Sequence, residues 1–174
     1  MIYDSFPTSD AETYRNGFEL AVGRLDELPD DEHGARGAAL GQAMDAMLGL
    51  WLLKAADAAF FDRVGAVLHD RRPAWGAWRA GLDTALWERT REGWYVASMR
   101  RSELEIVADE VDSRWPGDDV PLVEASVRAE VDDEMREIGP GIPALPADVI
   151  PRGIPEGHWW WHLPAGEPAD ELGY

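Results

Sequence analysis

The sequence contains no cysteine. Its absence excludes disulfide bonds, thiolate catalysis, and zinc or iron–sulfur sites with cysteine ligands. The phosphate-binding pattern GxxxxGK[ST], the nucleophile elbow GxSxG, the dinucleotide pattern GxGxxG and the zinc pattern HExxH are missing as well. The sequence therefore leans against an enzyme, and it offers no catalytic residue, metal ligand set or cofactor.

Long apolar runs are also scarce. The longest, residues 46–53, is far shorter than the roughly 20 residues that cross a bilayer. The opening residues MIYDSFPTSD lack the basic and apolar regions of a signal peptide. We therefore expect a cytoplasmic protein that makes no membrane contact.

Negative charge dominates the composition, with 34 acidic residues against 16 lysines and arginines. The net charge is −18, with −7 in residues 1–32, −8 in 100–138 and −4 in 139–174, whereas residues 33–99 carry +1. Such a field repels nucleic-acid phosphates and anionic lipids, and it accelerates association with a basic protein. We expect no direct nucleic-acid binding; the acidic surface serves either a basic partner or solubility alone.

Apolar side chains recur at three- and four-residue steps along most of the chain, which predicts an all-α fold. We expect a single-domain bundle of about five helices in residues 1–138. The predicted helices cover residues 9–25, 36–54, 55–70, 73–86, 102–115 and 118–138, and the second and third of these ranges are compatible with one helix or two. Ser102 and Glu105 fit a capping box at a helix start, and WYVASM, residues 94–99, has strand propensity.

The composition changes after residue 138. Residues 139–174 hold seven of the twelve prolines and six glycines, which prevents a continuous helix. The same segment is too apolar for a solvated tail. It is predicted to form an irregular C-terminal arm, part of the same domain, that packs across the helices.

The arm contains a tryptophan cluster between two histidines. In helical geometry His158 and His162 would share a face and suit a metal, but the flanking prolines and glycine leave little room for a helix. In extended geometry His158, Trp160 and His162 share one face and Trp159 and Trp161 the other. The cluster is then either an anchor for the arm or a binding surface for a partner or small ligand.

Acidic residues cluster on the two predicted helices between residues 102 and 138. They are expected on one side of each helix, away from its apolar stripe, as a solvated face or as a docking surface for basic residues. The residues of this acidic face are Glu103, Asp109, Glu110, Asp112, Glu130, Asp133, Glu134 and Glu137.

In gross properties the chain resembles bacterial immunity or inhibitor proteins, which neutralise basic toxins by charge mimicry. The likeness rests on composition and not on any aligned residue. It implies a binding protein whose acidic face steers a basic partner and whose Trp159–Trp161 segment supplies an apolar anchor. Two alternatives stay open: a small enzyme or ligand-binding protein with a pocket between bundle and arm, using His158 or His162, and a structural subunit that self-associates.

Overall fold

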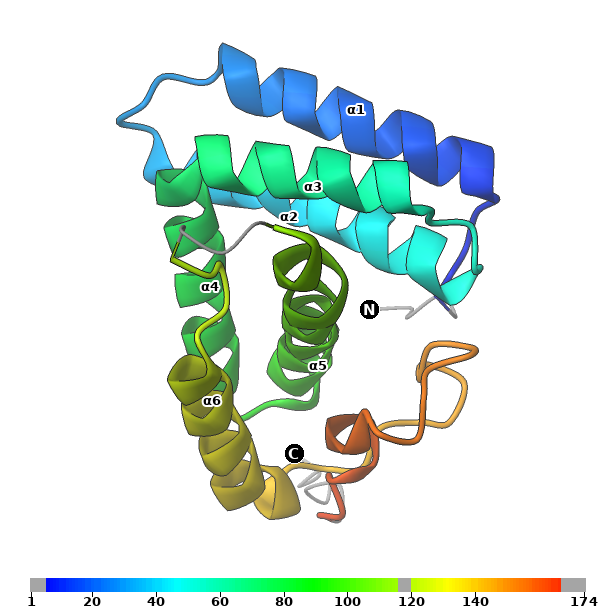
Figure 1. The fold of residues 1–174 in the computed structure, drawn as a ribbon. Coiled ribbons are helices and arrows are strands. Elements are labelled where there is room, and N and C mark those ends of the chain that lie inside the picture. The colour runs from blue at the N-terminus through cyan, green and yellow to red at the C-terminus, as the bar shows by residue number, and fades with distance from the viewer. Residues whose placement is uncertain (1–5, 116–119, 167–174) are drawn as a thin grey trace, which may run out of the picture.

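The computed structural model describes residues 6–115 and 120–166, and within them the regular elements are helices (Figure 1). This confirms the predicted all-α class. Residues 36–70, for which the sequence permits one helix or two, form two, so the described chain has six α-helices where about five were expected. The helices are α1 (Ala11–Glu27), α2 (His33–Leu52), α3 (Ala58–Asp70), α4 (Arg72–Trp87), α5 (Arg91–Ile106) and α6 (Ala125–Ile138).

Local chemistry fixes several helix starts. Asp10, Asp57 and Thr90 each accept a hydrogen bond from the backbone N–H three residues on, at 2.8, 2.9 and 3.0 Å. Each satisfies a backbone donor that the first helical turn leaves without a partner. Pro73 lies in the first turn of α4, where its missing N–H is harmless.

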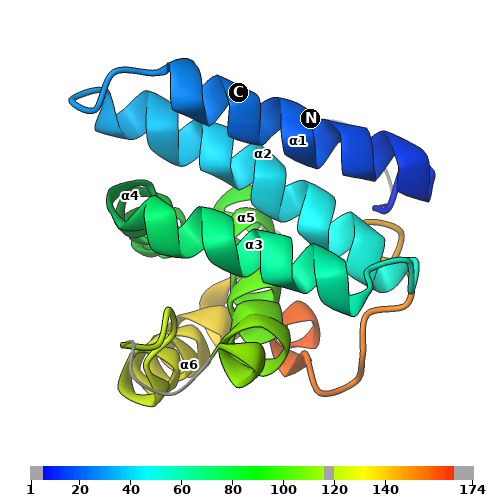
Figure 2. The same cartoon turned by 45° about the horizontal axis from the view of Figure 1, so that its top comes forward.

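The helices form a layer with a crossing helix beneath it. α1 and α2 run antiparallel, and α3 lies along the same layer, where its Phe60 contacts Phe18 of α1 (Figures 1 and 2). α5 crosses below this layer and contacts α2 and α4, while α6 lies on the side of α4. The arm reaches the opposite side of α5. α5 is therefore the central element, and ten of its sixteen residues are buried.

The α5 helix corrects two sequence interpretations. Residues 94–99 lie inside it and not in a strand, and Ser102 lies near its end and does not cap a start. The helix begins at Arg91, after its N-cap Thr90, and its first turn packs tightly on α4, since a Cβ on Gly93 would collide with the carbonyl of Ala85. Tertiary packing thus overrides the strand propensity of WYVASM.

The chain leaves α5 through a wide turn. A π-helical segment, Val107–Val111, and a short 3-10 helix, Asp112–Arg114, follow directly. The carboxylate of Asp112 then accepts hydrogen bonds from the backbone N–H groups of Leu122 and Val123, both at 3.0 Å. The last helix was predicted from residue 118; residues 116–119 lie outside the described part, and α6 begins at Ala125.

The arm packs against the core over residues 139–166. Two short 3-10 helices, Gly139–Gly141 and Trp159–His162, are its only regular elements in that range. Trp160 and Trp161 are buried, as are Ile142 and Val149. The arm is thus irregular and lies on the helices, as predicted for these residues.

Candidate functional site

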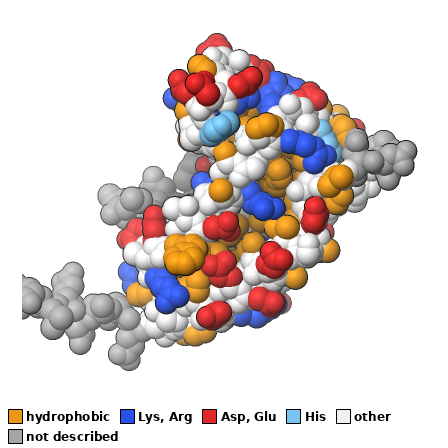
Figure 3. All heavy atoms as spheres, turned by 90° about the vertical axis from the view of Figure 1, so that its left-hand side faces the viewer, with side chains coloured by type: hydrophobic (Ala, Val, Ile, Leu, Met, Phe, Trp, Pro, Cys, Tyr) orange, Lys and Arg blue, Asp and Glu red, His pale blue; other side chains and the backbone are white. Residues whose placement is uncertain are grey.

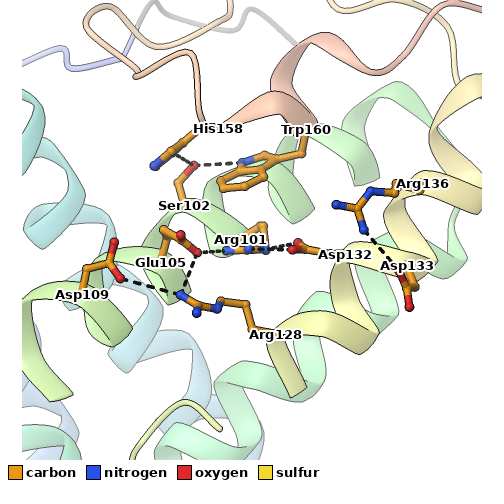
Figure 4. A network of polar contacts seen from close by, with 10 residues as sticks. All are labelled: Arg101, Ser102, Glu105, Asp109, Arg128, Asp132, Asp133, Arg136, His158 and Trp160. Atoms are coloured by element: carbon orange, nitrogen blue, oxygen red, sulfur yellow. Dashed lines mark hydrogen bonds and ion pairs between the residues drawn. The ribbon is translucent and has the colours of Figure 1, made fainter. Parts of the chain in front are cut away.

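One hydroxyl holds the aromatic arm to α5. Ser102 Oγ accepts hydrogen bonds from the indole N–H groups of Trp160 and Trp161, at 3.1 and 3.0 Å, and lies 3.1 Å from Nδ1 of His158 (Figure 4 shows the first and last of these contacts). Both indoles can only donate. The single proton of Ser102 is then free to donate to His158, so the hydroxyl is fully used.

This accounting fixes the protonation of His158. Nδ1 accepts a hydrogen bond from the Ser102 hydroxyl, so the imidazole is neutral and carries its hydrogen on Nε2. The pKa of His158 agrees: burial lowers it from 6.5 to about 4, with Glu105 acting to raise it and Arg101 to lower it further. The ring also stacks on Trp51, with centroids 5.6 Å apart.

A buried arginine joins α5, α6 and the arm. The Arg101 side chain is 3% exposed. It forms a bidentate ion pair with Asp132 of α6, at 2.6 and 3.1 Å, and a second pair with Glu105 at 2.7 Å (Figure 4). Its guanidinium lies 4.3 Å from the ring centroid of Trp160, in cation–π geometry. The arm is therefore held to α5 by the cation–π contact of Arg101 as well as by the hydrogen bonds of Ser102.

The predicted arm residues thus differ in access. His158, Trp160 and Trp161 are sealed in the core, Trp159 is half-buried with Arg136 over its ring at 4.6 Å, and His162 is exposed. The expected alternation of two extended faces is wrong because the segment forms a 3-10 turn, which carries Trp160 and Trp161 into the core together. The sealed indoles present no surface to a partner.

The predicted acidic face divides into several environments. Glu103 is 1% exposed, which corrects its assignment to a solvated face. Asp112 holds the backbone before α6. Three of the others form ion pairs: Asp109 with Arg128, Glu110 with Arg114 and Asp133 with Arg136. The remaining three, Glu130, Glu134 and Glu137, lie along α6.

Two of these residues line a groove between α4 and α6, which we call the acidic groove. Its volume is about 360 Å³. Figure 3 faces the side of the molecule that carries α4 and α6, and there acidic side chains surround hydrophobic surface. The lining residues are Arg79, Leu82, Asp83 and Trp87 from α4 and Val127, Glu130, Val131 and Glu134 from α6.

Like charges crowd the acidic groove. The pKa of Glu134 is raised by partial burial first, and then by repulsion from Asp83 and Glu137. Arg79 is the one basic residue in the lining. A further positive charge from outside would relieve this repulsion.

Trp87 is the unusual member of the acidic groove. All nine tryptophans lie in the described residues, and Trp87 alone among them is largely exposed, at 77%. Sequence reasoning missed it. The signal was present, because Trp87 falls one position off the apolar stripe formed by Trp75, Trp78, Leu82 and Leu86.

Residues 6–115 and 120–166 contain no group of three His, Asp or Glu side chains arranged to hold a metal. No helix in the same residues is both long and apolar enough to cross a membrane. Comparison of the chain with protein-family models, curated proteins and solved structures gives no match.

Proposed function

We propose that this chain is a binding protein for a basic protein partner, which docks in the acidic groove. The observation that carries the proposal is Trp87, 77% exposed and set among Asp83, Glu130 and Glu134. Tryptophan is enriched at the centre of protein interfaces because a rigid ring removes much area from water at small entropic cost. The surrounding carboxylates select lysine and arginine side chains.

The charge of the whole chain supports the same partner class. A net charge of −18 attracts a basic protein from a distance and raises its association rate. An immunity or inhibitor protein against a basic toxin would use this combination of field and anchor. In this proposal the anchor is Trp87 and not the Trp159–Trp161 segment, since the arm is occupied in holding the fold.

The pocket between bundle and arm receives less support. His158 is buried and hydrogen-bonded through Nδ1 to Ser102, and His162 is exposed. Neither histidine lines any of the four cavities described for this molecule. No observation favours catalysis by either of them.

The first experiment compares two variants of equal charge. One neutralises the groove with Asp83→Asn, Glu130→Gln and Glu134→Gln; the control neutralises Glu12, Glu27 and Asp31, three exposed acids on or beside α1. Immobilised wild type and control should capture the same protein from a low-salt lysate of the source cells, and the groove variant should lose it. Titration calorimetry with the purified partner then gives the affinities.

A second matched pair tests the aromatic anchor. Trp87→Ala should weaken binding of that partner by about 2 kcal/mol, or roughly 30-fold. Leu20→Ala removes an equally exposed apolar side chain, 74% against 77%, and should leave binding unchanged. Equal capture by both triple variants, or a loss confined to Leu20→Ala, would place binding elsewhere and contradict the proposal.

A further inference from the structure

A second hollow lies between α2, α4 and α5, away from the acidic groove. Its volume is about 300 Å³, at the small end of the range for ligand pockets. Aromatic and apolar side chains form most of its wall, including Trp78, Tyr95 and Met99. Two carboxylates, Asp45 and Glu103, face it together. We call this hollow the carboxylate cavity.

Glu103 is the unexplained residue of the carboxylate cavity. It is 1% exposed, and neither of its oxygens accepts a hydrogen bond from an N–H or O–H group of the described protein. Carboxylates are almost never buried without a partner, since desolvation of the charge is costly. An orphaned carboxylate at the wall of a hollow points to a ligand that supplies donors.

Asp45 does not supply them in its ionised form. Two ionised carboxylates can only accept hydrogen bonds, so the contact between Asp45 and Glu103 becomes a hydrogen bond only when one of them is protonated. The pKa of Glu103 fits this sharing: burial raises it well above its usual range, and the charge and hydrogen bond of Asp45 raise it further. Burial also raises the pKa of Asp45, which is nevertheless the more exposed residue of the two, so the pair extends from the sealed carboxyl to the mouth of the cavity.

Arg100 lines the same cavity without neutralising the pair. Its Nη1 donates to the carbonyl of Trp78, and its guanidinium lies 5.6 Å from the centre of that indole. Space for this position comes from Gly81, where a Cβ would collide with Nη1. Its charge lowers the pKa of Glu103, yet its hydrogen bond is directed to the backbone of α4. When the two acids lose the proton that they share, one negative charge remains that Arg100 does not offset.

We propose that the carboxylate cavity binds a small organic ammonium ion, whose N–H groups donate to Glu103 and Asp45 and whose apolar part lies against the aromatic wall. An alkylammonium has three donors and one positive charge, which matches two acceptors with one surplus negative charge. The ring of Tyr95, which also lines the cavity, attracts cations through its face. A calcium ion fits less well, because it takes six to eight oxygens.

The test uses n-butylammonium chloride as the probe, with 1-butanol as the neutral analogue. Two-dimensional ¹H–¹⁵N NMR of the full chain should show shifts of residues around Asp45 and Glu103 with butylammonium in the millimolar range, and none with 1-butanol. Glu103→Gln and Asp45→Asn should each weaken binding at least tenfold. Glu92→Gln removes the same charge from an exposed position of α5 and should bind like wild type.

A stability readout separates a ligand site from a structural pair. In the Glu103→Gln variant the side-chain amide donates a hydrogen bond to Asp45 while Asp45 stays ionised. The substitution should therefore raise the melting temperature by about 2–6 °C while binding is lost. Absence of shifts with butylammonium, equal shifts with 1-butanol, stronger shifts with calcium chloride, or full binding by Glu103→Gln would each overturn the proposal. None of these results bears on the acidic groove, which shares no lining residue with the carboxylate cavity.

Discussion

Ser102 and Glu103 are neighbours on α5, equally buried at 0% and 1%, and opposite in how their polar atoms are used. Ser102 Oγ serves three partners at once, two indoles and an imidazole. Glu103 has no donor at either oxygen within the described protein. Consecutive residues of one helix thus point to two different environments, the arm on one side and the carboxylate cavity on the other.

The difference separates what holds the fold from what is available to a ligand. A buried polar group with every partner in place contributes to stability and specifies one arrangement of the chain. A buried charge without partners lowers stability, and proteins keep such groups where binding or chemistry uses them. The arm side of α5 should therefore be sensitive to substitution, whereas the cavity side tolerates neutralisation.

The largest effect is expected from Arg101→Ala on the arm side. The substitution leaves the half-buried carboxylate of Asp132 without its cation, removes one of the two cations that pair with Glu105, and uncovers the ring of Trp160. Removing one partner of a buried ion pair costs about 4 kcal/mol. Urea unfolding followed by circular dichroism should show the corresponding fall in the free energy of unfolding.

Arg136→Ala is the matched control for this prediction. Arg136 also pairs with an aspartate, Asp133 at 3.2 Å, and also lies over a tryptophan, but its side chain is 55% exposed. Water screens an exposed pair, so its loss should cost no more than about 1 kcal/mol. Equal losses for the two variants would show that burial of Arg101 is not what stabilises the arm.

The second largest effect should be a loss of stability at acidic pH, caused by protonation of His158. Its pKa is about 4 in the folded protein and 6.5 in the unfolded chain, so the unfolded state binds more protons between these values. The contribution of His158 is complete above pH 6.5 and is lost as the pH falls towards 4, by about 3 kcal/mol in all. Urea unfolding at a series of pH values measures the slope.

The groups that face His158 define the control. Glu105 and Arg101 bear on the ring electrostatically, Trp51 stacks on it, and Ser102 donates to it. An asparagine places an acceptor where Nδ1 was, so His158→Asn should flatten the slope between pH 4 and 6.5. His162→Asn, on an exposed residue, should leave the slope as it is; equal slopes in wild type and His158→Asn would refute the assignment.

Helical periodicity predicted the class of the fold and most helix ranges because those helices bury simple apolar stripes. It failed for α5, where the buried positions include Ser98, Arg101, Ser102 and Glu103. These polar residues follow the helical steps of three and four, yet a hydrophobicity pattern does not count them as core. The burial of Arg101 and Ser102 follows from partners on α6 and on the arm, more than 30 residues away in the sequence.

The sites were predictable to a smaller extent. The sequence indicated an acidic surface, and Glu130 and Glu134 do lie together in the acidic groove. It could not indicate Asp83 and Trp87 as their neighbours, because α4 and α6 meet only in three dimensions. The Asp45–Glu103 pair joins α2 to α5 in the same way, and no local spacing connects two residues so far apart.

Among Arg101, His158 and Ser102, the three buried residues of the arm side, the smallest effect should come from Ser102→Ala, which breaks the hydroxyl contacts without removing a charge. Two indole N–H groups and one imidazole nitrogen lose their partner in the core, and the expected cost is about 2 kcal/mol. Ser98 lies one helical turn earlier, equally buried, and its Oγ has no partner in the described residues. Ser98→Ala should therefore leave the free energy of unfolding unchanged or slightly raised. If both alanine variants unfold at the same urea concentration, the three contacts of Ser102 do not stabilise the arm, and the contrast with Glu103 loses its basis.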